Sequence, residues 1–145
     1  MCEPQNELTF NSFNGCSKMA AEAVLLKSFR ERIAAHMAGT GTLYPVKYIA
    51  YGDGGHDSDL SPISPSEDAT ALAHEVLRKE VAAVRQDDSL SVTGKGTIEN
   101  NELIGVQLSE AALVDSQGNL IGIKTFAPKV KEADERYQIE IKVRF

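Results

Sequence analysis

The chain has 145 residues and a mass of 15.7 kDa, with 15 Lys and Arg against 21 Asp and Glu, so its formal net charge is −6. This length suits one domain with one core, and 42% apolar with 25% charged residues is ordinary globular usage. The pI is near 5.1 because the chain has no excess of Lys and Arg, the residues that bind phosphates. We therefore expect no nucleic-acid partner.

Membrane and secreted disulfide-rich classes are also excluded. No apolar run approaches the roughly 20 residues of a membrane-spanning helix, so we expect no membrane partner. The first residues contain neither a basic region nor an apolar stretch, and we expect no signal peptide. Two cysteines, Cys2 and Cys16, are too few for a disulfide framework.

Residues 1–16 are polar apart from Leu8, Phe10 and Phe13, and show no helical or strand period. Two interpretations stay open for this segment. It is either a frayed terminus or an extended arm that docks its three apolar side chains on a neighbouring subunit. In the second case Leu8, Phe10 and Phe13 are candidates for an assembly interface.

Residues 17–38 predict the longest helix, capped by Ser17 and stopped by Gly39. Its apolar stripe comprises Met19, Ala23, Leu26, Phe29, Ile33 and Met37. The β-forming residues over 43–51 then predict a strand that starts near Pro45.

The stretch Ser64-Pro65-Ser66-Glu67 has the pattern of a capping box. Ser64 would be the N-cap, Pro65 the first helical residue, and Glu67 the side chain that reaches back. This pattern predicts a second, short helix that ends near Val76.

The rest of the chain favours strands. Apolar residues and glycines alternate over 90–98, and residues 111–126 predict a hairpin around the turn 115–119. The last nine residues alternate cleanly, which is typical of a strand with one wet face. Its buried face should carry Tyr137, Ile139, Ile141 and Val143. The predicted fold is α+β, with a long N-terminal helix and a short second helix packed on a mostly antiparallel β-sheet or sandwich.

The acidic loop Gly52–Asp59 offers weak metal-ligand candidates, which are Asp53, His56, Asp57 and Asp59. A calcium loop needs a distal Glu that is absent at the right distance, and a zinc site needs more His or Cys. We interpret the loop as a solvated turn and expect no metal and no cofactor.

Two glycine-rich stretches invite a phosphate-loop interpretation, but neither has the required context. No helix follows Gly52–Gly55 directly, and Gly94-Lys95-Gly96-Thr97 lacks an upstream glycine at the right spacing. We interpret these glycines as sites of tight turns or close strand approach. No nucleophile-elbow pattern accompanies the three histidines, so we expect no catalytic residue and no enzyme.

Three segments, in the same order and spacing, resemble the N-terminal domain of phage tail-collar fibre proteins. Residues 48–55 (YIAYGDGG) resemble that family's "I-A-x-G-D-G-G" strand and loop, and residues 70–78 (TALAHEVLR) its "T-x-L-x-x-E-V-x-R" segment. Residues 109–122 are similar to "E-I-G-L-F-D-A-D-G-N-L-I-A", with "G-L-F-D" changed to Ala112-Leu113-Val114-Asp115. The resemblance covers residues 19–145, and we expect an attachment domain without the fibre shaft that usually follows it in the family.

The resemblance implies one attachment domain over 17–145, to which residues 1–16 add an extended N-terminal arm. It implies a structural virion protein of a tailed phage or prophage, in the tail, collar, neck or baseplate, and in the host cytoplasm during assembly. Partners would be copies of itself, as a trimer by analogy with fibres, and other tail, neck or baseplate proteins. Two alternatives stay open: a ligand- or metal-binding module that uses the Gly52–Asp59 loop, and a small enzyme of unknown chemistry.

Overall fold

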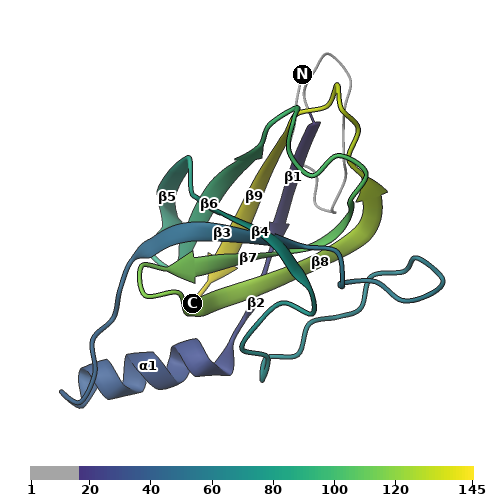
Figure 1. Ribbon diagram of the computed structural model, residues 1–145. Coiled ribbons are helices and arrows are strands. Elements are labelled where there is room, and N and C mark those ends of the chain that lie inside the picture. The colour runs from purple at the N-terminus through teal and green to yellow at the C-terminus, as the bar shows by residue number, and fades with distance from the viewer. Residues whose placement is uncertain (1–16) are drawn as a thin grey trace.

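The computed structural model describes residues 17–145, and the side chains from residue 23 onward. Two β-sheets face each other, and a single helix within this range, α1 (Lys27–Met37), lies at one end (Figure 1). The first sheet has the strand order β1 (Ser17–Glu22), β9 (Tyr137–Arg144), β6 (Ser91–Ile98), β5 (Ala83–Asp88). The second has the order β2 (Val24–Leu25), β8 (Leu120–Val130), β7 (Gln107–Asp115), β3 (Val46–Gly52), β4 (Glu75–Glu80).

The mostly antiparallel sandwich is thus confirmed, and so are the hairpin formed by β7 and β8 and the strand at the C-terminal end. All neighbouring strands are antiparallel except β1 and β9, which run parallel. The predicted buried face of β9 is confirmed, because its four alternating apolar side chains are fully buried: Tyr137, Ile139, Ile141 and Val143.

Bent chain segments join the two sheets on both sides of the sandwich. Between β1 and β2, the N–H of Ala23 donates to the carbonyl of Lys142 at 2.7 Å. Between β4 and β5, the N–H of Val81 donates to Lys47 (2.9 Å) and that of Ala82 to Lys95 (2.7 Å). Each segment therefore pairs first with one sheet and then with the other, which protects backbone groups that would otherwise lie at open edges.

Glycines on β6 let the two sheets approach closely. A Cβ atom on Gly94 would lie 2.5 Å from a methyl of Leu113, and one on Gly96 would lie 2.1 Å from the hydroxyl oxygen of Tyr51. The side chains of the second sheet thus occupy the space that inward side chains of β6 would fill. Burial there raises the pKa of the Tyr51 phenol above its usual range.

The predicted helix over 17–38 is wrong in its first half, because residues 17–25 form β1 and β2. The helix begins only after Leu26, whose N–H donates to the carbonyl of Ile121 at 3.0 Å. The alanines of this segment favour a helix, but the edges of β9 and β8 offer backbone partners, and tertiary pairing overrides local propensity.

The predicted second helix is also wrong, since residues 64–74 form no helix, only a single turn, and lead directly into β4. Ser64 caps nothing; instead the Ser66 hydroxyl accepts the N–H of Asp68 at 3.1 Å in a local turn. Glu67 does not reach back along its own segment. It forms an ion pair with Arg30 of α1 at 3.1 Å.

The helix α1 is attached to the sandwich through its first two turns. The ring of Phe29 lies 5.5 Å from that of Phe145, and the Arg32 guanidinium donates to the carbonyl of Leu120 at 2.8 Å. The last turn of the helix is exposed, with Met37 78% accessible. The helix therefore presents an open surface at one end of the molecule (Figure 1).

No helix in the described part of the chain is long and apolar enough to span a membrane.

Candidate functional site

One buried carboxylate, Glu110 on β7, holds both ends of the long segment between β3 and β4. Its Oε2 accepts the N–H groups of Gly54 (3.0 Å) and His74 (2.8 Å), and its Oε1 accepts the N–H of Ala73 (2.9 Å). Glu110 is only 2% exposed, and hydrogen bonds to an ionised acceptor are stronger than neutral ones. A single side chain thus closes residues 54–73 into a loop against the sheet.

The neighbouring Ser109, fully buried, anchors the same loop. Its hydroxyl oxygen accepts the N–H of Gly55 at 2.8 Å and lies 2.8 Å from the Nδ1 of His56. Ser109 and His56 are therefore close together, but the serine oxygen is enclosed and already bonded. This pair holds the loop in place and does not present a nucleophile.

The glycine-rich stretch after β3 has a steric explanation. A Cβ on Gly52 would lie 2.5 Å from the Glu110 carboxylate, and one on Gly55 would lie 2.5 Å from the carbonyl oxygen of Ser109. The loop backbone presses against β7 at a distance that only glycine allows. Close approach, rather than phosphate binding, accounts for these glycines.

Three of the four metal-ligand candidates have partners for their side chains in three different places, and the fourth, Asp59, bonds to Asp57 through its backbone N–H. Asp53 lies 2.5 Å from the Nδ1 of His74, and His56 contacts Ser109. Asp57 accepts the N–H groups of Asp59 (2.9 Å) and Ser61 (3.0 Å) within its own turn. Over residues 17–145 the structure holds no group of three or more His, Cys, Asp or Glu placed to bind a metal ion.

The assembly candidates Leu8, Phe10 and Phe13 lie outside the described residues.

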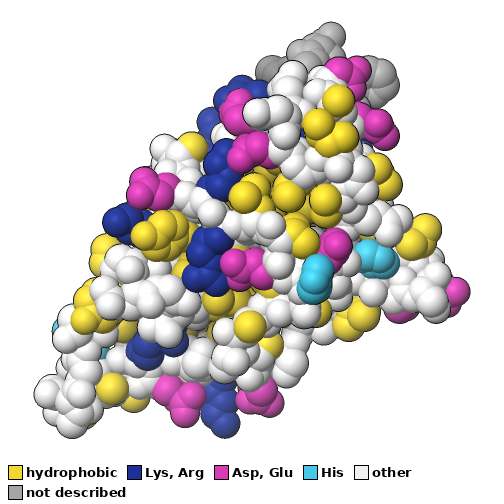
Figure 2. All heavy atoms as spheres, viewed as in Figure 1, with side chains coloured by type: hydrophobic (Ala, Val, Ile, Leu, Met, Phe, Trp, Pro, Cys, Tyr) yellow, Lys and Arg dark blue, Asp and Glu magenta, His cyan; other side chains and the backbone are white. Residues whose placement is uncertain are grey.

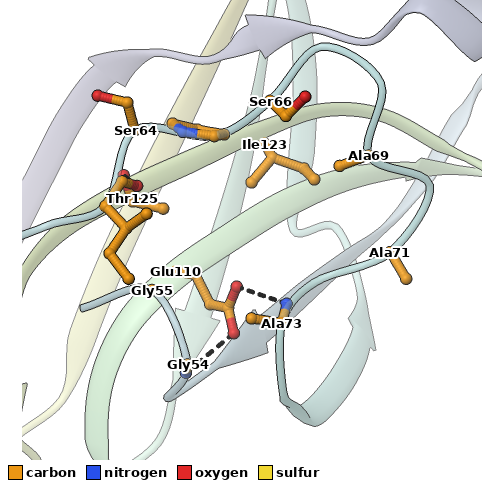
Figure 3. A pocket seen from close by; sticks show the side chains of 12 residues that line it. Gly54, Gly55, Ser64, Ser66, Ala69, Ala71, Ala73, Glu110, Ile123 and Thr125 are labelled. Carbon is orange, nitrogen blue, oxygen red and sulfur yellow. Dashed lines mark hydrogen bonds between the residues drawn. The ribbon is translucent and has the colours of Figure 1, made fainter. Parts of the chain in front are cut away.

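A cavity of about 360 Å³ lies between the 54–73 loop and strands β7 and β8 (Figure 3). We call it the loop pocket. Ile123 and Thr125 of β8 and Glu110 of β7 form its floor, and its walls are mostly small or apolar side chains of the loop, including Ile63, Pro65, Ala69 and Ala71. Because both carboxylate oxygens of Glu110 are occupied by backbone N–H groups, the pocket offers shape and apolar surface rather than reactive groups.

Sequence reasoning assigned no role to Ser109 and Glu110. Carboxylates are too common in this chain to stand out individually, and the residues to which Glu110 binds lie 36 to 56 positions away. The signal that was available is local: a Ser-Glu pair interrupts the otherwise apolar run from Leu108 to Val114. A polar pair inside a buried strand needs hydrogen-bond partners, and here the glycine-rich loop supplies them.

The three segments that carry the family resemblance meet at this corner of the molecule. Glu110 joins the third segment to the first through Gly54 and to the second through Ala73. The Arg78 guanidinium donates to Glu75 at 2.7 Å and to the carbonyl of Gly118 at 3.4 Å, which links β4 to the turn between β7 and β8. The pattern of these segments therefore reflects their contacts with one another.

Comparison with known proteins gave one match. The family model for "Phage tail-collar fibre protein, N-terminal" matches residues 19–144. No significant match was found among curated proteins or among solved structures.

Proposed function

Because the chain belongs to the phage tail-collar fibre protein family, we propose that it is an attachment module that acts through protein–protein assembly in the tail, collar, neck or baseplate. Members of this family are structural components of the phage tail. The observation that carries the proposal is the extent of the match, which covers nearly the whole described sandwich rather than one appended motif.

The chemistry of the described residues is consistent with an assembly role. The polar groups that come together around the loop pocket bind backbone or one another, as Glu110 and Ser109 do. Large apolar side chains are instead exposed at loops and at the helix end, among them Met37, Leu60 and Ile104. Such a distribution favours contact surfaces over a catalytic centre, and we propose that the protein is not an enzyme and needs no cofactor.

We further propose that the protein forms a homo-oligomer, with a trimer as the expected state by resemblance to fibres. Residues 1–16 would contribute Leu8, Phe10 and Phe13 to a neighbouring subunit. Support for this step comes from the sequence, since three bulky apolar groups are more than a solvated tail needs.

The first test is the presence of the protein in tails purified from the phage that encodes it, detected with an antibody against residues of the folded domain. We expect it to sediment with intact tails and to remain bound through repeated washing at about 0.1 M salt. Tails that are complete and infectious without it would contradict the proposal.

The second test concerns the arm and uses light scattering on the purified protein. Replacing Leu8, Phe10 and Phe13 together by Ser should lower the mass from that of an oligomer. The matched control replaces Thr9, Asn11 and Ser12 by Ala and should leave the mass unchanged. An oligomer that persists in the first variant would contradict the role of the arm.

The ligand- or metal-binding alternative has less support. Asp53, His56 and Asp57 each take a separate partner within the described part of the molecule. Titration with Zn²⁺ or Ca²⁺ followed by calorimetry separates the two readings, and saturable one-to-one binding would favour the alternative.

A further inference from the structure

We propose that the loop pocket receives an apolar side chain of another tail protein, and that Lys or Arg residues flank this side chain in the partner. This inference rests on the proposed tail function and adds the chemistry of the partner. It depends on three features of the described residues: the interior of the pocket, the charge of its rim, and the exposed apolar side chains of the 54–73 loop.

The interior of the pocket has the character of an anchor site. At about 360 Å³ it lies in the range of natural binding cavities, and half of its lining residues are alanine, isoleucine or proline. Its one charged lining group, Glu110, already accepts three backbone hydrogen bonds. An apolar side chain could therefore enter without leaving a buried polar atom unpaired, whereas a charged one would lose its hydration.

We use rim for the chain segment 48–77, which contains the loop that lines the pocket, and this segment is acidic. No Lys or Arg occurs between Lys47 and Arg78, while this stretch contains six Asp and Glu. Figure 2 shows acidic side chains without Lys or Arg over the protruding loop at the right of the molecule.

Three of the six acids are partnered within the protein. Glu67 pairs with Arg30, Glu75 with Arg78, and Asp53 with His74. Asp57, Asp59 and Asp68 form no ion pair in the part of the chain that the structure describes, and all three are exposed. Their charge is complementary to a basic partner.

Two large apolar side chains of the 54–73 loop are exposed. Ile63, which lines the pocket, is 48% exposed, and Leu60 at the tip of the loop is 53% exposed. Leu60 also has a φ of 61°, a left-handed conformation that is costly for a leucine. Strained backbone of this kind concentrates at binding sites, where the surrounding structure holds it in place.

The arm of the chain is a poorer match for this rim than a basic partner. Residues 1–16 contain Glu3 and Glu7 and no Lys or Arg, so their charges have the same sign as those of the rim. We therefore assign the pocket to a different protein and treat the arm as an outcome of the test.

The test adds purified protein back to tails of a phage that lacks the gene and measures binding by sedimentation. Ala71→Trp fills the pocket, and Asp59→Lys reverses one rim charge. Ala133→Trp and Asp134→Lys, both in the exposed connection before β9, are the matched controls. Thermal unfolding of all four variants checks that each is folded.

We expect Ala71→Trp to weaken binding by about tenfold or more, because a blocked anchor pocket removes the centre of an interface. Asp59→Lys should weaken it by several-fold, and binding of the wild type should fall between 0.1 M and 1 M salt as the Debye length drops from about 10 Å to about 3 Å. Both control variants should bind as the wild type does.

Each contrary result has a distinct meaning. If the wild type binds and all four variants bind equally, the pocket proposal is overturned while the tail function stands. If the wild type does not bind, the tail function fails and this inference fails with it. If a peptide of residues 1–16 binds the purified wild type, and Ala71→Trp abolishes that binding, the occupant is the arm and the basic partner is excluded.

Discussion

The interior between the two sheets and the 54–73 loop on the outer face of the second sheet are held in place by different means. The interior is filled by fully buried apolar side chains from both sheets, such as Ile49, Leu113 and Ile141. The loop contributes one buried apolar side chain, Leu72, to a smaller cluster on the outer face. The side chains of Ser109 and Glu110 fix the two ends of its backbone, and hydrogen bonds from Lys27 and Thr125 hold its middle.

This difference means that the interior supplies the stability of the molecule, whereas a few polar contacts set the shape of the loop. Close-packed apolar burial gives the sandwich most of its free energy of folding. We expect a loop that is held by a few hydrogen bonds to have a fixed shape and to open without unfolding the sandwich. The loop pocket therefore belongs to the part of the molecule that can change most easily on binding.

The largest expected effect is in the interior. Ile141→Ala should lower the free energy of unfolding by about 2–5 kcal/mol, because it leaves a cavity among fully buried side chains. Urea denaturation measures the change. The control, Lys142→Ala on the outward face of the same strand, should cost less than about 0.5 kcal/mol. A loss well under 1 kcal/mol for Ile141→Ala would mean that this face is not the core.

Glu110→Gln tests whether the loop and the sandwich unfold together. The amide keeps the shape but replaces one acceptor oxygen by a donor, so an N–H group of the loop loses its partner, at a cost of about 1.5–3 kcal/mol. Hydrogen exchange should accelerate at Gly54, Ala73 and His74. If the loop is independent, urea denaturation changes little. An equal loss of free energy by hydrogen exchange and by urea denaturation would show that the loop and the sandwich form one cooperative unit.

Gly55→Ala probes the same contact through its sterics. The added Cβ would lie 2.5 Å from the carbonyl oxygen of Ser109, so the loop must shift, at a cost of about 1–3 kcal/mol. Exchange of the Gly54 amide and the thermal midpoint measure this cost. Gly39→Ala is a useful contrast, because its Cβ meets nothing within 4 Å and its φ of 78° is the sole source of strain. Equal effects would point to backbone conformation rather than contact with β7.

The smallest effect concerns polar contacts at the surface of the first sheet. The Thr93 hydroxyl and then the Arg85 guanidinium hold the pKa of Asp87 below its usual value of 3.8. Because the pKa of Asp87 is lower in the folded than in the unfolded state, its ionised carboxylate stabilises the fold above about pH 4. This stabilisation is lost as the pH falls through the folded pKa. Thr93→Val should raise the pKa of Asp87, as measured by carbon-detected NMR titration. Thr97→Val is the control, and an unchanged pKa in Thr93→Val would refute the role of the hydroxyl.

The strands with clear alternation or a clear turn were predictable from sequence. The alternation from Tyr137 to Arg144 and the turn at Asp115–Asn119 are local patterns, and the structure shows the same strands there. The family resemblance was also visible in the sequence, because its residues recur in order and at fixed spacing. An alternating pattern in neighbouring residues predicts the strand correctly when the fold buries one face of that strand.

The remaining features depended on partners far along the chain. Residues 17–25 have the composition of a helix but pair with β9 and β8, which lie about a hundred residues later. The capping-box pattern at Ser64 predicts a helix, yet the N–H groups of Ala73 and His74 bind Glu110. Local propensity is worth a few tenths of a kcal/mol per residue, whereas hydrogen bonds to a buried carboxylate are each worth about 1.5–3 kcal/mol. The sequence alone determined the family, the hairpin and the last strand; the sheet edges and the buried Glu110 decided the rest, because only the folded chain brings those partners together.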